Sequence, residues 1–205
     1  MHILEKMFMV STLLAFILVG CGNSSSQKES KKSQMTEETN NNDEGSESYI
    51  PYLKEHHANY SQDGSSMTPS PTKDVNAKSI DWTIRASSNE GAENLVKYLH
   101  FMINKLENNG NPRPFDKLFL MEAYMKYNHY YITTVEQSAT SVVVSKQAIT
   151  DCAYKVIAAH SDVVSGDFFA QGDIKNDYSL KAETILVSSA CDDVRTSVEA
   201  YISQR

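Results

Sequence analysis

Hydrophobic residues are distributed very unevenly along this chain, and the distribution limits where a folded core can form. Residues 22–48 contain one methionine and no aromatic or β-branched aliphatic residue. Such a segment cannot bury enough apolar surface to offset the entropy of ordering its backbone, so we expect it to be disordered. Periodic hydrophobicity is concentrated in residues 80–205, which we expect to form the folded body.

The first twenty residues are strongly apolar. The run from Phe8 to Val19 is interrupted only by Ser11 and Thr12. It is shorter than the roughly 20 residues that a helix needs to cross the hydrocarbon layer of a membrane. Its length is typical of the hydrophobic region of a secretory signal peptide.

The sequence Leu18-Val19-Gly20-Cys21 resembles the lipobox of bacterial lipoprotein precursors, in which a small residue directly precedes an obligatory cysteine. The resemblance covers residues 1–22. It implies that the signal peptide (residues 1–20) is cleaved between Gly20 and Cys21, and that the Cys21 sulfur receives a diacylglyceryl group. Two or three acyl chains, palmitate among them, are sufficient for lasting attachment to membrane lipid. An ordinary signal peptide and a buried N-terminal helix are the alternatives.

The residue after the cysteine bears on localisation in such lipoproteins. In cells with two membranes, an aspartate there often retains the protein at the inner membrane. This chain has Gly22, which implies the outer membrane, facing the periplasm. In a cell with one membrane, the protein would sit on the outer face of the plasma membrane.

Three segments are therefore expected: the signal peptide (residues 1–20), the lipidated cysteine with a mostly disordered tether (residues 21–79), and a helical body (residues 80–205). Four apolar residues near the end of the tether could instead dock on the body: Tyr49, Ile50, Tyr52 and Leu53.

The spacing of apolar residues in the body favours helices. Ser87 and Glu90 match the first and last positions of a capping box, and a helical stripe of leucines follows them. We therefore expect an all-α fold, an antiparallel four-helix bundle. Residues 133–141 contain no Gly or Pro, so three helices with one long central helix are the alternative. Ile80, Trp82 and Ile84 alternate as in a strand, but a lone strand has no partner, and we expect them to cap the bundle.

Cys152 and Cys191 lie on the apolar faces of the last two expected helices. They are equally far from the centre of the loop expected at residues 165–178, so an antiparallel hairpin brings them level. Because the signal peptide directs the chain to an oxidising compartment, we predict a disulfide between them. Two buried free thiols are the alternative.

The sequence contains few motifs that indicate binding or catalysis. The net charge is −7, and the body has no basic stripe, which argues against nucleic-acid binding. Motifs for haem attachment, phosphate binding and nucleophilic catalysis do not occur, so we predict no catalytic residue, cofactor or metal site. His160 lies on a core stripe, and we expect it to be a buried, hydrogen-bonded histidine.

Five aromatic residues are candidates for contact with a partner: Tyr124, Tyr127 and Tyr131 on one helix face, and Phe168 and Phe169 in a loop. Core packing and a plug at the end of the bundle are the alternative interpretations. We predict a non-enzymatic scaffold, adaptor or accessory subunit, attached to membrane lipid through Cys21 and bound to an envelope protein. The alternative is a small-ligand binder or small enzyme, which a ligand-sized pocket with converging polar groups would favour.

Overall fold

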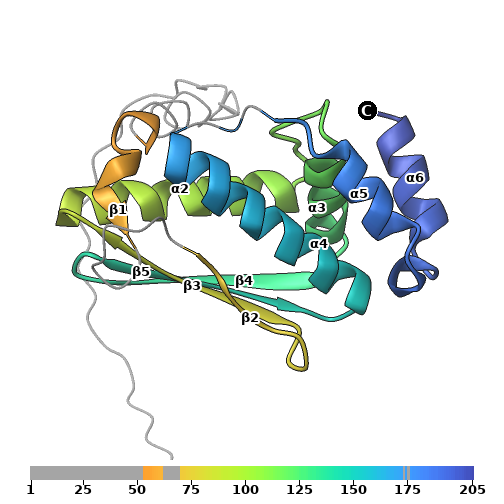
Figure 1. The fold of residues 1–205 in the computed structure, drawn as a ribbon, viewed down its shortest axis with the longest axis horizontal. Coiled ribbons are helices and arrows are strands. Elements are labelled where there is room, and N and C mark those ends of the chain that lie inside the picture. Colours follow the sequence, from red (N-terminus) through yellow and green to blue (C-terminus); the bar gives the residue numbers. More distant parts are fainter. Residues whose placement is uncertain (1–52, 62–69, 173, 175) are drawn as a thin grey trace, which may run out of the picture. The chain divides into compact units, whose positions relative to one another are not determined.

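An antiparallel β-sheet forms one layer of the folded body (Figure 1). The computed structural model describes residues 53–61, 70–172, 174 and 176–205. The elements in chain order are η1 (His57–Asn59), β1 (Tyr60–Ser61), β2 (Thr72–Asp74), β3 (Ser79–Ala86), α2 (Asn89–Glu107), α3 (Lys117–Tyr127), β4 (Tyr131–Ser138), β5 (Ser141–Ala148), α4 (Asp151–Val163), the π-helix η2 (Val164–Phe169), α5 (Ser179–Leu186), η3 (Ser189–Cys191) and α6 (Arg195–Ser203). The predicted all-α bundle, in either its four-helix or its three-helix form, is therefore wrong: the body is an α/β fold.

Several predictions concern residues that lie outside the described ranges. These are the signal peptide, the cleavage site between Gly20 and Cys21, the tether residues 22–48, and the docking candidates Tyr49, Ile50 and Tyr52. Leu53, the fourth docking candidate, is fully buried, and Tyr60 is buried as well. Both belong to the core beneath β3, so the body includes residues upstream of position 80. In the part of the chain that the structure describes, no helix is both long and apolar enough to span a membrane.

The sheet is built around β3. Its strands lie in the order β1-β3-β5-β4, and β2 also pairs with β3. All pairs are antiparallel, and the register places Trp82 opposite Val144 and Ile84 opposite Val142. Residues 80, 82 and 84 therefore form a central strand and do not cap a bundle. They have partners because the segment expected to be helical, residues 131–148, is a hairpin.

That hairpin joins β4 to β5 through the two-residue turn Ala139–Thr140. Ala139 adopts a positive φ of 49°, which a two-residue turn between antiparallel strands requires. Residues 133–141, which the alternative of one long central helix made helical, are instead most of β4, the turn and the first residue of β5. Val142 lies in β5, and α4 begins at Asp151.

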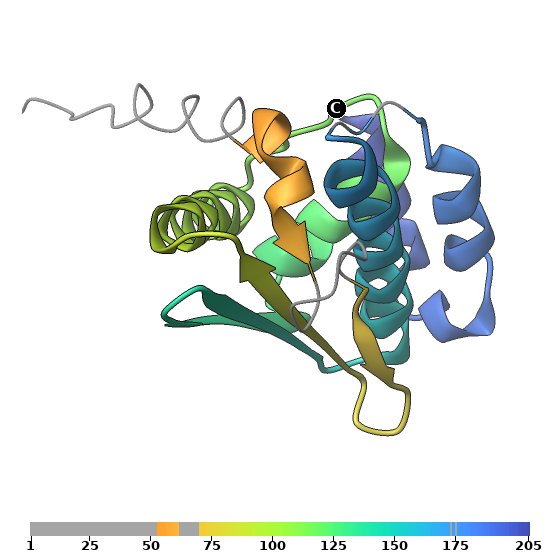
Figure 2. The same cartoon turned by 60° about the vertical axis from the view of Figure 1, so that its left-hand side comes forward.

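The helices cover one face of the sheet (Figures 1 and 2). Helix α3 is the most enclosed, because nine consecutive residues from Leu118 to Lys126 are buried. Asp116 caps its N-terminus by accepting a hydrogen bond from Leu118 N. Helix α2 begins one residue later than the expected capping box, because Ser88 is the N-cap and accepts from Gly91 N.

A disulfide joins Cys152, near the start of α4, to Cys191 in η3, and their Cα atoms are 4.7 Å apart. Both residues are fully buried, and the predicted pair is confirmed. The expectation of one continuous last helix is wrong, because this part of the chain is divided into α5, η3 and α6. Ser188 is extended at the first break, and its hydroxyl donates to the Ile185 carbonyl oxygen. Serine side chains compete in this way with helical hydrogen bonds.

Candidate functional site

A cavity of about 100 Å³ lies between the sheet and the helices. Seven of the lining residues have polar or ionisable side chains: Tyr98, Glu122, Lys126, Tyr131, Thr133, Lys146 and His160. The other ten have large apolar or aromatic side chains: Trp82, Leu99, Met102, Ile103, Leu106, Phe119, Val144, Val164, Phe168 and Ile174. We call this space the Glu122 cavity. Its α2 side is closest to solvent, because Leu99, Met102 and Ile103 are partly exposed.

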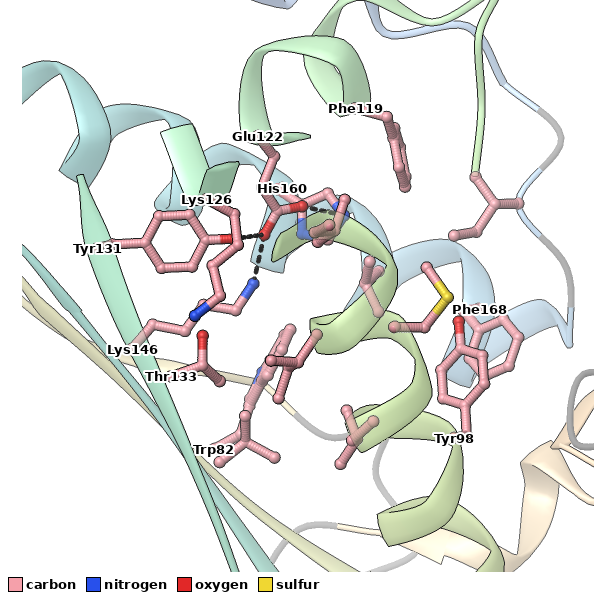
Figure 3. A pocket seen from close by; sticks show the side chains of 17 residues that line it. Trp82, Tyr98, Phe119, Glu122, Lys126, Tyr131, Thr133, Lys146, His160 and Phe168 are labelled. Atoms are coloured by element: carbon pink, nitrogen blue, oxygen red, sulfur yellow. Dashed lines mark hydrogen bonds and ion pairs between the residues drawn. The ribbon is translucent and has the colours of Figure 1, made fainter. Parts of the chain in front are cut away.

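The Glu122 carboxylate is the centre of the polar wall (Figure 3). Its Oε1 accepts hydrogen bonds from the Tyr131 hydroxyl at 3.0 Å and from Lys146 Nζ at 2.6 Å. Its Oε2 lies 2.8 Å from His160 Nε2. Three donors from β4, β5 and α4 therefore converge on one carboxylate from α3.

The sheet register positions the donors from the hairpin. Side chains alternate between the two faces of a strand, so Val142, Val144, Lys146 and Ala148 of β5 all face the helices. Thr133 of β4 lies directly opposite Lys146. The lysine therefore occupies an inward position that its neighbours fill with apolar side chains, and only 10% of it is exposed.

The charges on the wall stabilise one another. Burial alone would raise the pKa of the Glu122 carboxyl, but the charges and hydrogen bonds of His160 and Lys146 outweigh burial and hold that pKa well below its ordinary value. Burial, reinforced by the Glu122 carboxylate, raises the pKa of the Tyr131 hydroxyl well above its ordinary value. At neutral pH, Glu122 is an acceptor and Tyr131 a donor.

A second lysine extends the polar wall along α3. Lys126 lies one helical turn after Glu122, and its Nζ is 3.0 Å from the carboxylate of Glu107. Lys126 is almost completely buried, whereas Glu107 is 44% exposed. The ammonium groups of Lys126 and Lys146 lie 5.2 and 5.6 Å from the centre of the Tyr131 ring, where a ring face attracts cations.

His160 is hydrogen-bonded, as expected, but only one of its two ring nitrogens has a partner among the described residues. Its Nε2 contacts Glu122, and its ring packs edge-on against Phe119 at 4.6 Å between centroids. Its Nδ1 is buried and has no hydrogen-bond partner among the residues that the structure describes. A buried, unpaired ring nitrogen costs free energy unless something occupies it.

The five aromatic residues predicted to contact a partner have different environments. Tyr124, Tyr131, Phe168 and Phe169 are buried, and Tyr127 is 44% exposed. Tyr131 lies in β4 and does not share a helix face with Tyr124 and Tyr127, which lie in α3. Tyr131 and Phe168 line the Glu122 cavity. Phe168 and Phe169 lie in η2, not in a loop, and contact each other edge-on.

Sequence reasoning missed Glu122, Lys126 and Lys146 as site residues. The first two are charged residues four positions apart in an otherwise mostly apolar helix, which was a usable signal. Lys146 would have stood out only if β5 had been recognised as a strand. Within the described ranges, no group of three or more His, Cys, Asp or Glu residues is arranged to hold a metal ion.

Comparison of the chain with known protein families, with characterised proteins and with solved structures finds no match.

Proposed function

We propose that this protein is a lipid-anchored cell-envelope protein whose body binds a small, mainly apolar ligand in the Glu122 cavity. The observation that carries the proposal is a buried cluster of Glu122, Lys146 and His160 in a wall of an otherwise mostly apolar cavity. A mostly apolar space with a few convergent polar groups is typical of small-molecule sites.

The energetics of the cluster support a role beyond stability. Removing Glu122 and Lys146 from water is costly, and well-packed apolar residues in their place are often equally stabilising. An unfilled cavity also lowers stability, by roughly 24 cal/mol for each Å³. A ligand that fills the cavity and contacts the polar wall would explain why the protein keeps both the buried charges and the cavity.

The volume of the Glu122 cavity limits the size of the ligand. A dry cavity of roughly 150 Å³ can hold benzene, and the Glu122 cavity is smaller, at about 100 Å³. The buried part of the ligand is therefore a short branched chain or a small ring. A longer molecule would extend past the partly exposed side chains of α2.

The proposed location depends on the lipobox resemblance at Leu18–Cys21. Acylation of Cys21 would hold the body at an outer membrane facing the periplasm, or on the outer face of a plasma membrane. A role as scaffold, adaptor or accessory subunit bound to an envelope protein stays a prediction.

The matched substitutions Thr133→Phe and Thr134→Phe test ligand binding in the full-length protein. Thr133 lines the cavity, whereas its neighbour Thr134 is exposed on the opposite face of β4. Saturation-transfer NMR with a mixture of small neutral and charged molecules should detect binders for the parent and Thr134→Phe, and near-UV circular dichroism checks folding. We expect Thr133→Phe to lose them. Absence of any binder to the parent, or equal binding by Thr133→Phe, would overturn the proposal.

A further inference from the structure

We infer that the ligand of the Glu122 cavity is a small apolar carboxylic acid, bound with its acidic group against Lys146 and His160. This inference rests on the proposed function and specifies the chemical class of ligand. It depends on which hydrogen-bonding groups of the polar wall are already used and which remain.

Glu122 is the one carboxylate among the described residues that line the cavity, and both of its oxygens already have partners. Glu122 accepts from the Tyr131 hydroxyl and Lys146 on one oxygen and contacts His160 on the other. The Tyr131 hydroxyl donates its one proton to Glu122. A ligand that offers mainly donors would therefore compete with bonds that are already formed.

The unused groups are mainly donors. A lysine ammonium carries three N–H bonds, and Lys146 uses one of them on Glu122, with no other acceptor in contact within the described ranges. Lys126 similarly has one ion-pair partner, the partly exposed Glu107. An anionic acceptor on the ligand would satisfy buried ammonium groups that water reaches poorly.

The Nδ1 atom of His160 further restricts the chemical class of the ligand. Nε2 is directed to Glu122, so Nδ1 is the nitrogen that lacks a partner. If the ring is neutral with its proton on Nε2, Nδ1 accepts, and a carboxylic acid O–H can donate to it. If the ring is protonated, Nδ1 donates, and a carboxylate can accept. A carboxyl group matches both states, whereas a simple apolar molecule matches neither, and an ether, which can only accept, matches the protonated ring alone.

The apolar residues that line the cavity determine the apolar part of the ligand. Trp82, Val144, Phe119 and Phe168 are among the apolar residues that line the cavity, and its volume of about 100 Å³ suits a branched chain such as that of isovalerate. Trp82 is the one tryptophan of the chain, and Lys146 Nζ lies 5.9 Å from its ring centroid. Trp82 fluorescence should therefore respond when a carboxylate binds near Lys146.

The test compares isovalerate with isovaleramide, its neutral amide of the same shape, by titrating the full-length protein and following Trp82 fluorescence. We expect isovalerate to bind at least about tenfold more tightly. His160→Gln retains a donor for Glu122 and removes Nδ1, and Lys146→Met removes the cation. Each should reduce the preference to less than about threefold. The exposed residues in His100→Gln and Lys97→Met are matched controls and should preserve the preference.

The outcomes separate the two proposals. Equal binding of acid and amide would overturn the carboxylate inference and leave the ligand-binding function standing. A preference that both His160→Gln and Lys146→Met retain would also overturn the inference. Failure of every small molecule to bind would overturn both. If Lys146→Met does not fold, His160→Gln alone decides, because it retains both buried charges of the Glu122–Lys146 pair.

Discussion

Replacing Glu122 with glutamine removes one charge from the centre of the polar wall and changes its shape very little. The amide oxygen can still accept from the Tyr131 hydroxyl, but Lys146, only 10% exposed, is left without a counter-ion among the described residues. Breaking a buried ion pair by removing one partner typically costs about 3–5 kcal/mol. For a domain of this size that corresponds to a fall in melting temperature of roughly 6–20 °C.

Urea unfolding of the full-length protein, followed by Trp82 fluorescence and circular dichroism, measures this cost. Glu183→Gln is the control, since Glu183 pairs with Lys117 where both side chains are nearly half exposed, and it should cost less than about 1 kcal/mol. The double variant Glu122→Gln with Lys146→Met should lose at least about 1 kcal/mol less than the two single losses combined. A loss for Glu122→Gln no larger than that of the control, or fully additive losses, would refute the reasoning.

Three further predictions concern the Cys152–Cys191 disulfide, the stability of the protein at acid pH and the lipid anchor at Cys21. The Cys152–Cys191 disulfide spans a sequence separation of 39, worth up to about 4 kcal/mol in the chain-entropy model. Cys152→Ala, Cys191→Ala and the double variant should therefore lower the melting temperature by similar amounts, and unequal effects would contradict a shared bond. Because the pKa of Glu122 is lowered on folding from its ordinary value of 4.5, its stabilising effect is present above about pH 4.5 and is lost as the pH falls through the folded-state value. The parent should lose stability below about pH 5 more steeply than Glu122→Gln, and parallel pH profiles would argue against this. Cys21→Ser should release the full-length protein from the membrane fraction, and unchanged detergent partitioning would contradict the lipoprotein assignment.

The fold class was mispredicted because of a few residues in the hairpin. A two-residue turn is usually signalled by Asn-Gly or Asp-Gly, and here Ala139–Thr140 carries the turn. The run Val142–Val144 is continuously apolar, which a short run shares with a buried helix. The inward lysine at position 146 then interrupts the alternation typical of a strand. With the hairpin unrecognised, β3 had no partner to pair with.

Other features followed from local signals. The helix that follows Ser88 was predictable to within one residue from Ser87 and Glu90, because capping residues act on their own segment. The cysteine pair was predicted from a hairpin of two continuous helices, and it forms although the second helix is broken, because α5 and η3 bring the chain back towards the start of α4. The Glu122 site was not predictable in the same way, because its members come from α3, β4, β5 and α4, and only the sheet register brings them together.

The placement of β3 determines the order in which this body can fold. The β4–β5 hairpin closes through two residues, a local event that takes microseconds in isolated hairpins. Pairing of Trp82 with Val144 must instead close a loop that contains α2, α3 and β4, and such non-local pairing slows folding. A chain that emerges from a translocon N-terminus first exposes β3, with its apolar Ile80, Trp82 and Ile84, well before β5 is available. In the exported protein that we propose, the central strand would therefore stay open to aggregation until β5 emerges, and Trp82 fluorescence would report when that exposure ends.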